Sequence, residues 1–491
     1  MRDMKSSHSI PHSLPLHLLL LSLLLLAGCA SISSITSDSA ADRSLTVLYT
    51  NDEHGWMEGV TPQQGAANLY GLWQEQENYT PEGPFLILSG GDNWTGPAIS
   101  TTVSGASMVE VMNSMHYAAT AVGNHEFDFG LEVMAQRIEE ADFPYLSANV
   151  RWRQTGKVPT DLGIQPFTIV EVNELRVGII GLTTTSTPLT TMPTNVAALE
   201  FGDYAQAIRA TVPQVREQNV DLLFVIAHVC MAPIHQLAET LADLNIQMIG
   251  GGHCNELEAG RINDIVVLGG GSHLASYAKA TFHFNTQRNE LTDVEFSVHQ
   301  NEGGPVDESI GGIVQKWQRQ IESIMSIVIG YNATELPRNG ALLQQSFIAS
   351  WLVADSTADV AISNAGGIRA TLSAGEITVG TVFGLMPFDN TIIATSLTGA
   401  ELQQVLGEGR RPLVAGLTLR ENVWLDKNGS PLDANKYYRV LVNSFMYAGG
   451  DGYEGLAKFD PEGFETGTNY RQPFLDWLSS QKSTIARPLQ F

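Results

Sequence analysis

The sequence contains few cysteines, few basic residues and few long hydrophobic runs. Only three of its 491 residues are cysteine, and because Cys29 belongs to a processing signal described below, Cys230 and Cys254 are the one pair left that could form a disulfide. Lys and Arg number 27 against 52 Asp and Glu, which gives a net charge of -25. This acidity argues against binding of polymeric nucleic acid through its phosphates. A small anionic substrate would need local cations, either bound metal ions or placed arginines.

The long hydrophobic run lies at the N-terminus. Arg2 and Lys5 precede an apolar stretch at residues 14–26, which L-A-G-C at residues 26–29 closes. This ending resembles a bacterial lipoprotein signal, so we predict a signal peptide at residues 1–29, a lipidated Cys29 and a flexible tether at residues 30–43. The alternative is a transmembrane anchor, for which the run is short. No later segment is apolar for long enough to cross a bilayer, so we expect the body of the chain outside the cytoplasm, in the periplasm or at the cell surface.

The rest of the chain has the pattern of a layered α/β protein with two or three domains. Short apolar runs end repeatedly in Gly, Asn, Asp or His; they cover residues 45–50, 85–89, 118–122, 176–181, 222–227, 246–250 and 265–269. Such runs predict strands that are buried on both faces, and residues 205–217 and 234–244 predict helices that cover them. Residues 313–328 place their apolar side chains on one helical face, with Gly330 as a candidate C-cap, and predict a helix between two domains.

Polar side chains of the metal-ligand type follow five of these strands. They are Asp52, His54, Asp92, Asn124, His228 and His253. Any one of them could be a satisfied loop residue; taken alone, the G-N-H turn at residues 123–125 could simply start a helix that His125 caps. Because ligands of α/β sheets bind beyond the carboxyl ends of the strands, we expect all six at one sheet edge.

This mixture of carboxylates, imidazoles and an amide predicts a site for two adjacent divalent ions. Asp52 and His54 would hold one ion, Asn124, His228 and His253 the other, and Asp92 could bridge them. Imidazole together with carboxylate suits zinc, manganese or iron. Two such ions about 3.5 to 4 Å apart activate a bridging water for attack on a phosphoryl centre, so the chemistry indicated is phosphoester hydrolysis.

The order of the motifs, D-x-H, G-G-D, G-N-H-E-F-D, A-H and G-G-H, closely resembles the calcineurin-like metallophosphatase domain of the secreted 5'-nucleotidase and UDP-sugar hydrolase family. The resemblance implies a four-layer αββα domain at residues 44–305, a linker helix at 306–332 and a separate mixed α/β nucleotide-binding domain at 333–491. It also implies that the six residues above are metal ligands. His125 would be the catalytic histidine and Asp128 the aspartate that orients it.

One position departs from the family pattern. Where the family carries His or Gln as a further ligand of the first ion, this chain has Asn255, whose shorter side chain can still offer an oxygen. Cys254 beside it and Cys230, two residues after His228, either form a disulfide or leave Cys254 as a thiolate ligand.

The second half extends the resemblance through N-A-G-G-I-R at residues 364–369, P-F-D-N at 387–390, and Phe445 with G-G-D-G-Y at 449–453. The substrate-binding residues it implies are Asn364, Arg369, Phe388, Asn390, Phe445 and Asp451. The arginine would meet the phosphate or ribose end, the aspartate the ribose hydroxyls, and the two phenylalanines would stack the base while Asn390 contacts its edge. A further family arginine has no secure counterpart, and Arg338 is a possible substitute.

The sequence therefore predicts a hydrolase that releases phosphate from extracellular nucleotides with two divalent ions, zinc, manganese or similar. Two related activities use the same metals: a 2',3'-cyclic nucleotide phosphodiesterase with 3'-nucleotidase activity, and a UDP-sugar pyrophosphatase. An alternative of another class is an inactive surface lipoprotein that binds nucleotide or metal. The complete His125 and Asp128 pair argues against the last.

Overall fold

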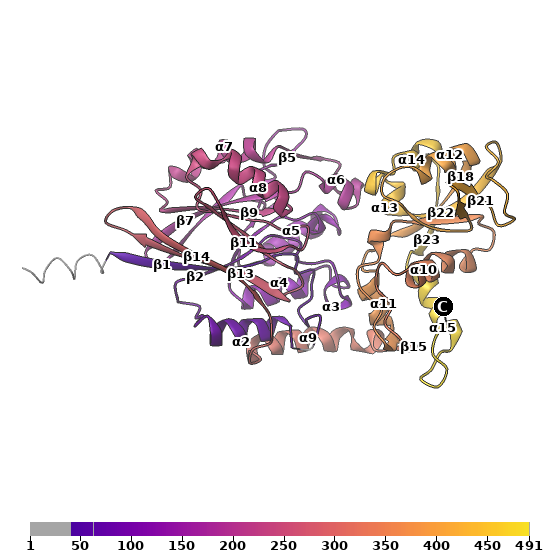
Figure 1. Cartoon of the computed structure of the whole chain (residues 1–491), viewed down its shortest axis with the longest axis horizontal. Coiled ribbons are helices and arrows are strands. Elements are labelled where there is room, and N and C mark those ends of the chain that lie inside the picture. Colours follow the sequence, from indigo (N-terminus) through magenta and orange to yellow (C-terminus); the bar gives the residue numbers. More distant parts are fainter. Residues whose placement is uncertain (1–40, 62, 491) are drawn as a thin grey trace, which may run out of the picture.

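The computed structural model describes residues 41–61 and 63–490, which form two domains joined along α9 (Glu308–Met325) (Figure 1). The predicted signal peptide, Cys29 and most of the tether lie outside the described residues. The first strand begins at Asp42, so the last two residues of the predicted tether are part of the sheet. None of the helices in the described part of the chain is long and apolar enough to cross a membrane.

The first domain is a sandwich of two six-stranded sheets. The first sheet has the order β14-β13-β1-β2-β3-β4, with strands Glu290–Gln300, Ser276–Asn285, Asp42–Thr50, Phe85–Ser89, Tyr117–Ala121 and Tyr145–Leu146. The second has the order β11-β12-β10-β9-β7-β6, with strands Leu257–Ile262, Ile265–Gly270, Met248–Gly250, Leu222–His228, Leu175–Thr183 and Phe167–Val172. A side pair is formed by β5 (Val150–Trp152) and β8 (Leu199–Phe201).

Successive side chains of a strand point to opposite faces of the sheet, and where both faces are buried the apolar run is continuous. In β1, Leu45, Val47 and Tyr49 point into the core between the sheets, whereas Leu48 packs on the helices outside. Between the sheets, the rings of Phe224 and Phe282 lie 4.8 Å apart. Both faces of the central strands are therefore buried, as the sequence predicts, whereas edge strands such as β14 leave one face exposed.

Helices cover the two outer faces of the sandwich (Figure 1). The first sheet packs on α2 (Ala66–Gln76), α4 (Ala106–Ser114), α5 (Leu131–Glu140) and α9. The second packs on α7 (Tyr204–Arg216) and α8 (Met231–Thr240). The predicted four-layer αββα arrangement is confirmed.

The predicted position of the ligand loops needs one correction. We expected all five at the edge of one sheet, but β1, β2 and β3 run parallel in the first sheet, whereas β9 and β10 run parallel in the second. The short apolar runs predict strands and not the sheet that each strand joins, because the central strands of both sheets are buried on both faces. The sheets pack face to face, and the loops after these strands meet at one end of the sandwich.

The linker helix also differs from the prediction. Asp307 caps α9 by accepting hydrogen bonds from the backbone N–H groups of Ser309 and Ile310, and the helix ends at Met325. Val328–Asn332 forms β15, which pairs with β17 (Gly375–Thr378) of the second domain. The helix predicted at residues 306–332 is therefore too long, because strand pairing overrides the apolar helical pattern of residues 327 and 328.

The second domain has a five-stranded sheet of order β19-β16-β22-β18-β23, with strands Leu413–Ala415, Val360–Ser363, Tyr437–Asn443, Thr391–Thr398 and Phe464–Asn469. One core lies between this sheet and helices α10 (Ala341–Ala354), α11 (Val379–Leu385) and α15 (Gln472–Gln481). The other lies beneath α12 (Gly399–Leu406), α13 (Ser444–Tyr447) and α14 (Gly455–Phe459). The hairpin β20 (Thr418–Arg420) and β21 (Val423–Leu425) extends from this side.

The two domains touch through several elements. The end of α9 and the short helix α3 (Ala98–Thr101) pack on α11, and α6 (Thr187–Thr190) of the first domain contacts the short helix η6 (Gly450–Gly452) of the second. The loops that follow the strands of the first domain therefore face the loops of the second across a narrow space.

We expect Phe224→Ala to lower the free energy of unfolding by about 3–5 kcal/mol, because it removes a fully buried ring from between the sheets. Denaturant unfolding followed by far-ultraviolet circular dichroism measures the change. Val298→Ala on the exposed side of β14 is the matched control and should shift the free energy by less than about 0.5 kcal/mol. Equal effects of the two substitutions would contradict the two-sheet core.

Candidate active site

A cavity of about 520 Å³ lies between the two domains. It is lined by all but one of the predicted site residues that the structure describes. The exception is His228, which is fully buried next to His253. The predicted residues that line it are Asp52, His54, Asp92, Asn124, His125, Asp128, His253, Asn255, Asn364, Arg369, Phe388, Asn390, Phe445 and Asp451. The structure thus brings together motifs that are separated by up to 400 residues of chain.

Asp92 lies at the centre of the predicted metal ligands. Its Oδ2 atom is 3.0 Å from His228 Nε2 and 3.8 Å from His54 Nε2, and His54 Nε2 is 3.7 Å from Asp52 Oδ1. Among the predicted metal and catalytic residues, two sets of side chains are close enough to hold a metal ion: His54 with Asp92 and His125, and Asp92 with His228 and His253. The two sets share Asp92, which is the position predicted to bridge two ions.

The orientation of the histidines is fixed by the backbone. The Nδ1 atom of His54 lies 2.8 Å from the carbonyl oxygen of Thr95, and that of His228 lies 2.9 Å from the carbonyl oxygen of Gly90. A carbonyl can only accept, so each Nδ1 carries a proton and each Nε2 faces the cavity.

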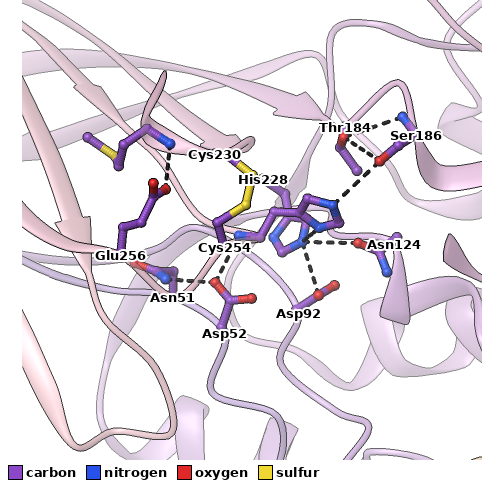
Figure 2. The surroundings of a disulfide bond; sticks show 12 residues. Asn51, Asp52, Asp92, Asn124, Thr184, Ser186, His228, Cys230, Cys254 and Glu256 are labelled. Carbon is purple, nitrogen blue, oxygen red and sulfur yellow. Dashed lines mark hydrogen bonds and ion pairs between the residues drawn. A yellow bond between two sulfur atoms is a disulfide. The ribbon is translucent and has the colours of Figure 1, made fainter. Parts of the chain in front are cut away.

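The surroundings of His228 Nε2 test whether a cation fits. Besides Asp92 Oδ2, this nitrogen lies 3.1 Å from Asn124 Oδ1 and 3.1 Å from His253 Nδ1 (Figure 2). The amide nitrogen of Asn124 donates to the Thr190 carbonyl, which turns the amide oxygen inward. Acceptor atoms thus converge on a point where a proton on Nε2 can satisfy only one or two of them. A divalent cation satisfies all of them, so the donor set fits a metal ion.

Charge in the cluster supports the same conclusion. Burial, with a smaller contribution from the Asp92 carboxylate, raises the pKa of Asp52 to about 6 in spite of the lowering effect of His228. Burial lowers the pKa of His228, but the Asp92 carboxylate outweighs it and raises this pKa to about 10. In the absence of metal the cluster therefore holds a proton that a divalent ion would displace.

Most of the predicted ligands have a left-handed backbone. The φ angles are 50° at Asp52, 48° at His54, 61° at Asp92, 71° at His253 and 59° at Asn255. Each such residue costs on the order of 1–3 kcal/mol unless its surroundings hold it, and such residues gather at functional sites. Gly123 is required for a steric reason, because a Cβ atom there would lie 2.2 Å from Asp92 Oδ1.

Two buried carboxylates that we did not single out from the sequence hold these loops. Glu126 accepts hydrogen bonds from the backbone N–H groups of Asp92, Asn93 and Gly123. Glu53 accepts from the side chains of Thr50, Ser89 and Asn93. Burial raises the pKa of Glu53 to about 7 and that of Glu126 to about 8. The sequence did contain a signal for them, since Glu53 lies between Asp52 and His54 and Glu126 lies between His125 and Asp128.

His125 and Asp128 form the expected pair. His125 Nδ1 lies 2.7 Å from Asp128 Oδ2, and the hydroxyl of Thr191 donates to the other carboxylate oxygen at 2.8 Å. Burial lowers the pKa of His125, but the carboxylates of Asp128 and Asp92 raise it more, so the net shift is upward. Thr191 had no sequence signal, because only the tertiary fold brings it to Asp128.

Arg369 of the second domain reaches the centre of the site. Its side chain is partly buried, and Nη2 lies 3.4 Å from His54 Nε2. The same guanidinium lies 5.7 Å from the ring centre of Phe388, whose ring in turn stacks on His125 at 5.5 Å. Residues from both domains therefore surround one point beside the ligand cluster.

The other substrate-binding residues predicted from the C-terminal motifs form one wall of the cavity. The Asn364 amide donates to Asp451 Oδ2 at 2.9 Å and accepts from Asn443 at 2.9 Å. Phe388 and Phe445 both line the cavity, although the ring on which Phe388 stacks here is that of His125. Arg338, the possible substitute for a missing arginine, also lines it.

Arg410 and Arg411 line the cavity as well, although they were not among the predicted site residues. Both side chains are exposed at the rim, directly after α12. Two adjacent arginines in a strongly acidic chain were a signal that could have found them.

Asn255 and the cysteines complete the site. Asn255 lines the cavity but is exposed, and among the described residues it forms no hydrogen bond with the other predicted ligands. Cys230 and Cys254 form a disulfide with their Cα atoms 5.1 Å apart (Figure 2). The alternative of Cys254 as a thiolate ligand is therefore wrong.

A four-layer sandwich with two overlapping ligand sets at its strand ends defines a protein of the metallophosphatase class. The 5'-nucleotidase C-terminal domain family matches residues 332–458. A 5'-nucleotidase of Vibrio vulnificus is 28% identical over 88% of this chain and 89% of its own length. The crystal structure of a 5'-nucleotidase precursor from Thermus thermophilus has a TM-score of 0.79 and 25% identity, and the match covers 91% of this chain and 98% of that one. The chain is therefore similar to 5'-nucleotidases over most of its length, and its second domain matches their C-terminal domain family.

We expect Asp92→Ala to remove both divalent ions, because Asp92 is shared by the two ligand sets. Elemental analysis after incubation with Mn²⁺ or Zn²⁺ and gel filtration should fall from about two ions per chain to fewer than one. Asp264→Ala, on an exposed turn, is the control and should retain the wild-type content. Two retained ions in the Asp92 variant would contradict the shared position.

Proposed function

We propose that the chain is a metal-dependent phosphoester hydrolase of the 5'-nucleotidase type, which releases phosphate from extracellular nucleotides. One observation carries this proposal. Two ligand sets that share Asp92 lie in the same cavity as Arg369 of the other domain, whose side chain is partly buried. The proposed ligands are Asp52, His54, Asp92, Asn124, His228 and His253, with Asn255 as a further oxygen donor of the first ion. When bound, the two ions supply Lewis acidity and lower the pKa of water.

The residues beside the ligands have separate tasks in this proposal. Arg369 binds the phosphoryl oxygens, since a guanidinium pairs with them in bidentate fashion. His125, held by Asp128, donates hydrogen bonds to the charge that develops on the phosphoryl group and gives a proton to the leaving oxygen. Thr191 fixes Asp128 and thereby the ring of His125. The upward shift of the His125 pKa suits a donor.

The nucleoside is proposed to lie against the second domain. Phe388 and Phe445 offer ring faces for the base, and Asn390 offers hydrogen bonds to its edge. Asp451, which Asn364 orients, would accept hydrogen bonds from the ribose hydroxyls. Because Phe388 stacks on His125 in the described structure, its ring has to turn away before a base can occupy this place.

Related activities remain as second candidates because they need the same metal set. A relative in Bacillus subtilis that is 26% identical over 83% of this chain is described as a trifunctional nucleotide phosphoesterase. A 2',3'-cyclic nucleotide phosphodiesterase with 3'-nucleotidase activity and a UDP-sugar pyrophosphatase would both leave His125 and Asp128 in the same roles. The extra arginines Arg410 and Arg411 at the rim favour substrates with more than one phosphate among these. An inactive nucleotide- or metal-binding lipoprotein would not need the Asp128 and Thr191 contacts that orient His125.

The location follows from the N-terminal pattern. We propose that the protein is lipidated at Cys29 and anchored to a bacterial membrane, in the periplasm or at the cell surface. An extracytoplasmic location agrees with the disulfide, because such bonds persist in oxidising compartments.

We expect His125→Ala to retain both metal ions and to lose about 10²- to 10⁴-fold in kcat, because it removes a donor to the transition state and no ligand of the proposed set. Steady-state phosphate release and elemental analysis measure the two effects. His116→Ala, on an exposed turn of the same domain, is the control and should keep the wild-type rate. Loss of one metal ion in the His125 variant would show instead that His125 is a ligand.

Phosphate release from AMP, from a 2',3'-cyclic nucleotide followed by phosphatase, and from UDP-glucose followed by phosphatase separates the candidate activities. We expect AMP to have the highest kcat/KM and a chelator to abolish it, because every step depends on the ligand cluster. Dominant hydrolysis of the cyclic ester or of the diphosphate would select a second candidate. Activity with none of them in zinc, manganese or cobalt would favour the binding lipoprotein.

A further inference from the structure

The two histidines of the second ligand set lie on separate loops of the second sheet. His228 is the last residue of β9, and Val229 and Cys230 lead from it into α8. His253 follows β10 in the loop that continues through Cys254 and Asn255 to β11. The nitrogens His228 Nε2 and His253 Nδ1 are only 3.1 Å apart, so the relative position of the two loops decides the geometry of this set.

Three links join these loops at successive positions. The N–H group of Gly252 donates to the Val229 carbonyl at 2.9 Å. The disulfide joins Cys230 to Cys254, the next residue after His253. The N–H group of Met231 donates to Glu256 Oε2 at 2.7 Å. Figure 2 shows the disulfide beside His228, with Glu256 on the far side of it.

The loop that carries His253 needs such links. His253 and Asn255 both have a left-handed backbone, with φ of 71° and 59°. Cys254 and Asn255 are exposed, so little packing holds them. The strained backbone of this loop therefore favours movement of His253 away from the cluster.

We propose that the Cys230–Cys254 disulfide, together with Glu256, positions His253 against His228 so that the second metal site is formed before the metal arrives. The sulfur atoms bind no ion in this role and touch no substrate, so the cysteines are positioning residues. The inference rests on the metal site of the proposed function. The clamp acts most directly on the ion that His228 and His253 would hold, because Asp52 and His54 lie on the loop after β1. The other ion is touched less directly, through Asn255 on the same loop and through Asp52, which accepts a hydrogen bond from the His253 N–H group at 2.9 Å.

The test is a calorimetric titration of chelator-treated and dialysed full chain with Mn²⁺, for wild type, C230S, C254S and C230S/C254S. We expect two ions per chain in wild type. In all three variants the affinity of one ion should fall by about 10- to 100-fold, the loss typical when a residue that orients a metal ligand is removed, while the affinity of the other ion changes less. Thermal unfolding of the metal-free proteins is measured in parallel.

Two comparisons separate positioning from general destabilisation. Ile208→Ala removes a buried side chain from α7 beneath the same sheet, so it should lower Tm without changing either affinity. E256Q keeps an oxygen acceptor for Met231 and should retain wild-type affinity, whereas E256A should weaken the same ion as the cysteine variants.

Three results would overturn the inference. Unchanged affinities in the cysteine variants would show that the clamp is not needed, while two ions in wild type would leave the proposed function intact. Loss of affinity in C254S but not in C230S would make Cys254 a thiolate ligand. A wild-type chain that binds no Mn²⁺ would overturn both this inference and the proposed function.

Discussion

The structure of the site depends on one constraint, the burial of Asp92 among groups that also carry lone pairs. Its Oδ2 atom faces His228, His54 lies close by, and its Oδ1 atom accepts from the His125 backbone. A proton on His228 Nε2 satisfies only one or two of the acceptors around it, and this donor set would suit divalent cations. The buried glutamates, the left-handed residues and the disulfide are all arranged so that this cluster persists in the folded chain.

The division of the chain into two domains gives the cluster its substrate pocket. The first domain supplies the ligands and the His125–Asp128 pair, and the second supplies Arg369 and the aromatic wall. In an acidic protein a phosphate needs local positive charge, and Arg369 brings it within 3.4 Å of His54. Because the site is complete only when the domains meet, the contacts of α9 with α11 and of α6 with η6 are part of the catalytic apparatus.

The core between the sheets stabilises the fold, whereas the loops at the ends of the strands form the site. The core between the sheets is built from side chains such as Phe224 and Phe282 and would exist without the site. The loops at its edge hold residues in unfavourable backbone conformations, which the glutamates Glu53 and Glu126 stabilise through hydrogen bonds to both backbone and side chains. Such a loop edge is rigid because its buried polar groups are satisfied, and a satisfied network is costly to disturb.

The sequence by itself determined the strands, the chemistry of the ligands and the family, because an apolar run that ends in a metal-ligand side chain is a local pattern. It also determined the pair His125 and Asp128, three residues apart in a single turn. Only the tertiary structure decided that the ligand loops come from two sheets, since the central strands of both sheets are buried on both faces and their runs look alike. It also decided that residues 328–332 form a strand, that Thr191 holds Asp128, and that Cys230 pairs with Cys254. These contacts join residues that are distant along the chain, so no local pattern could specify them.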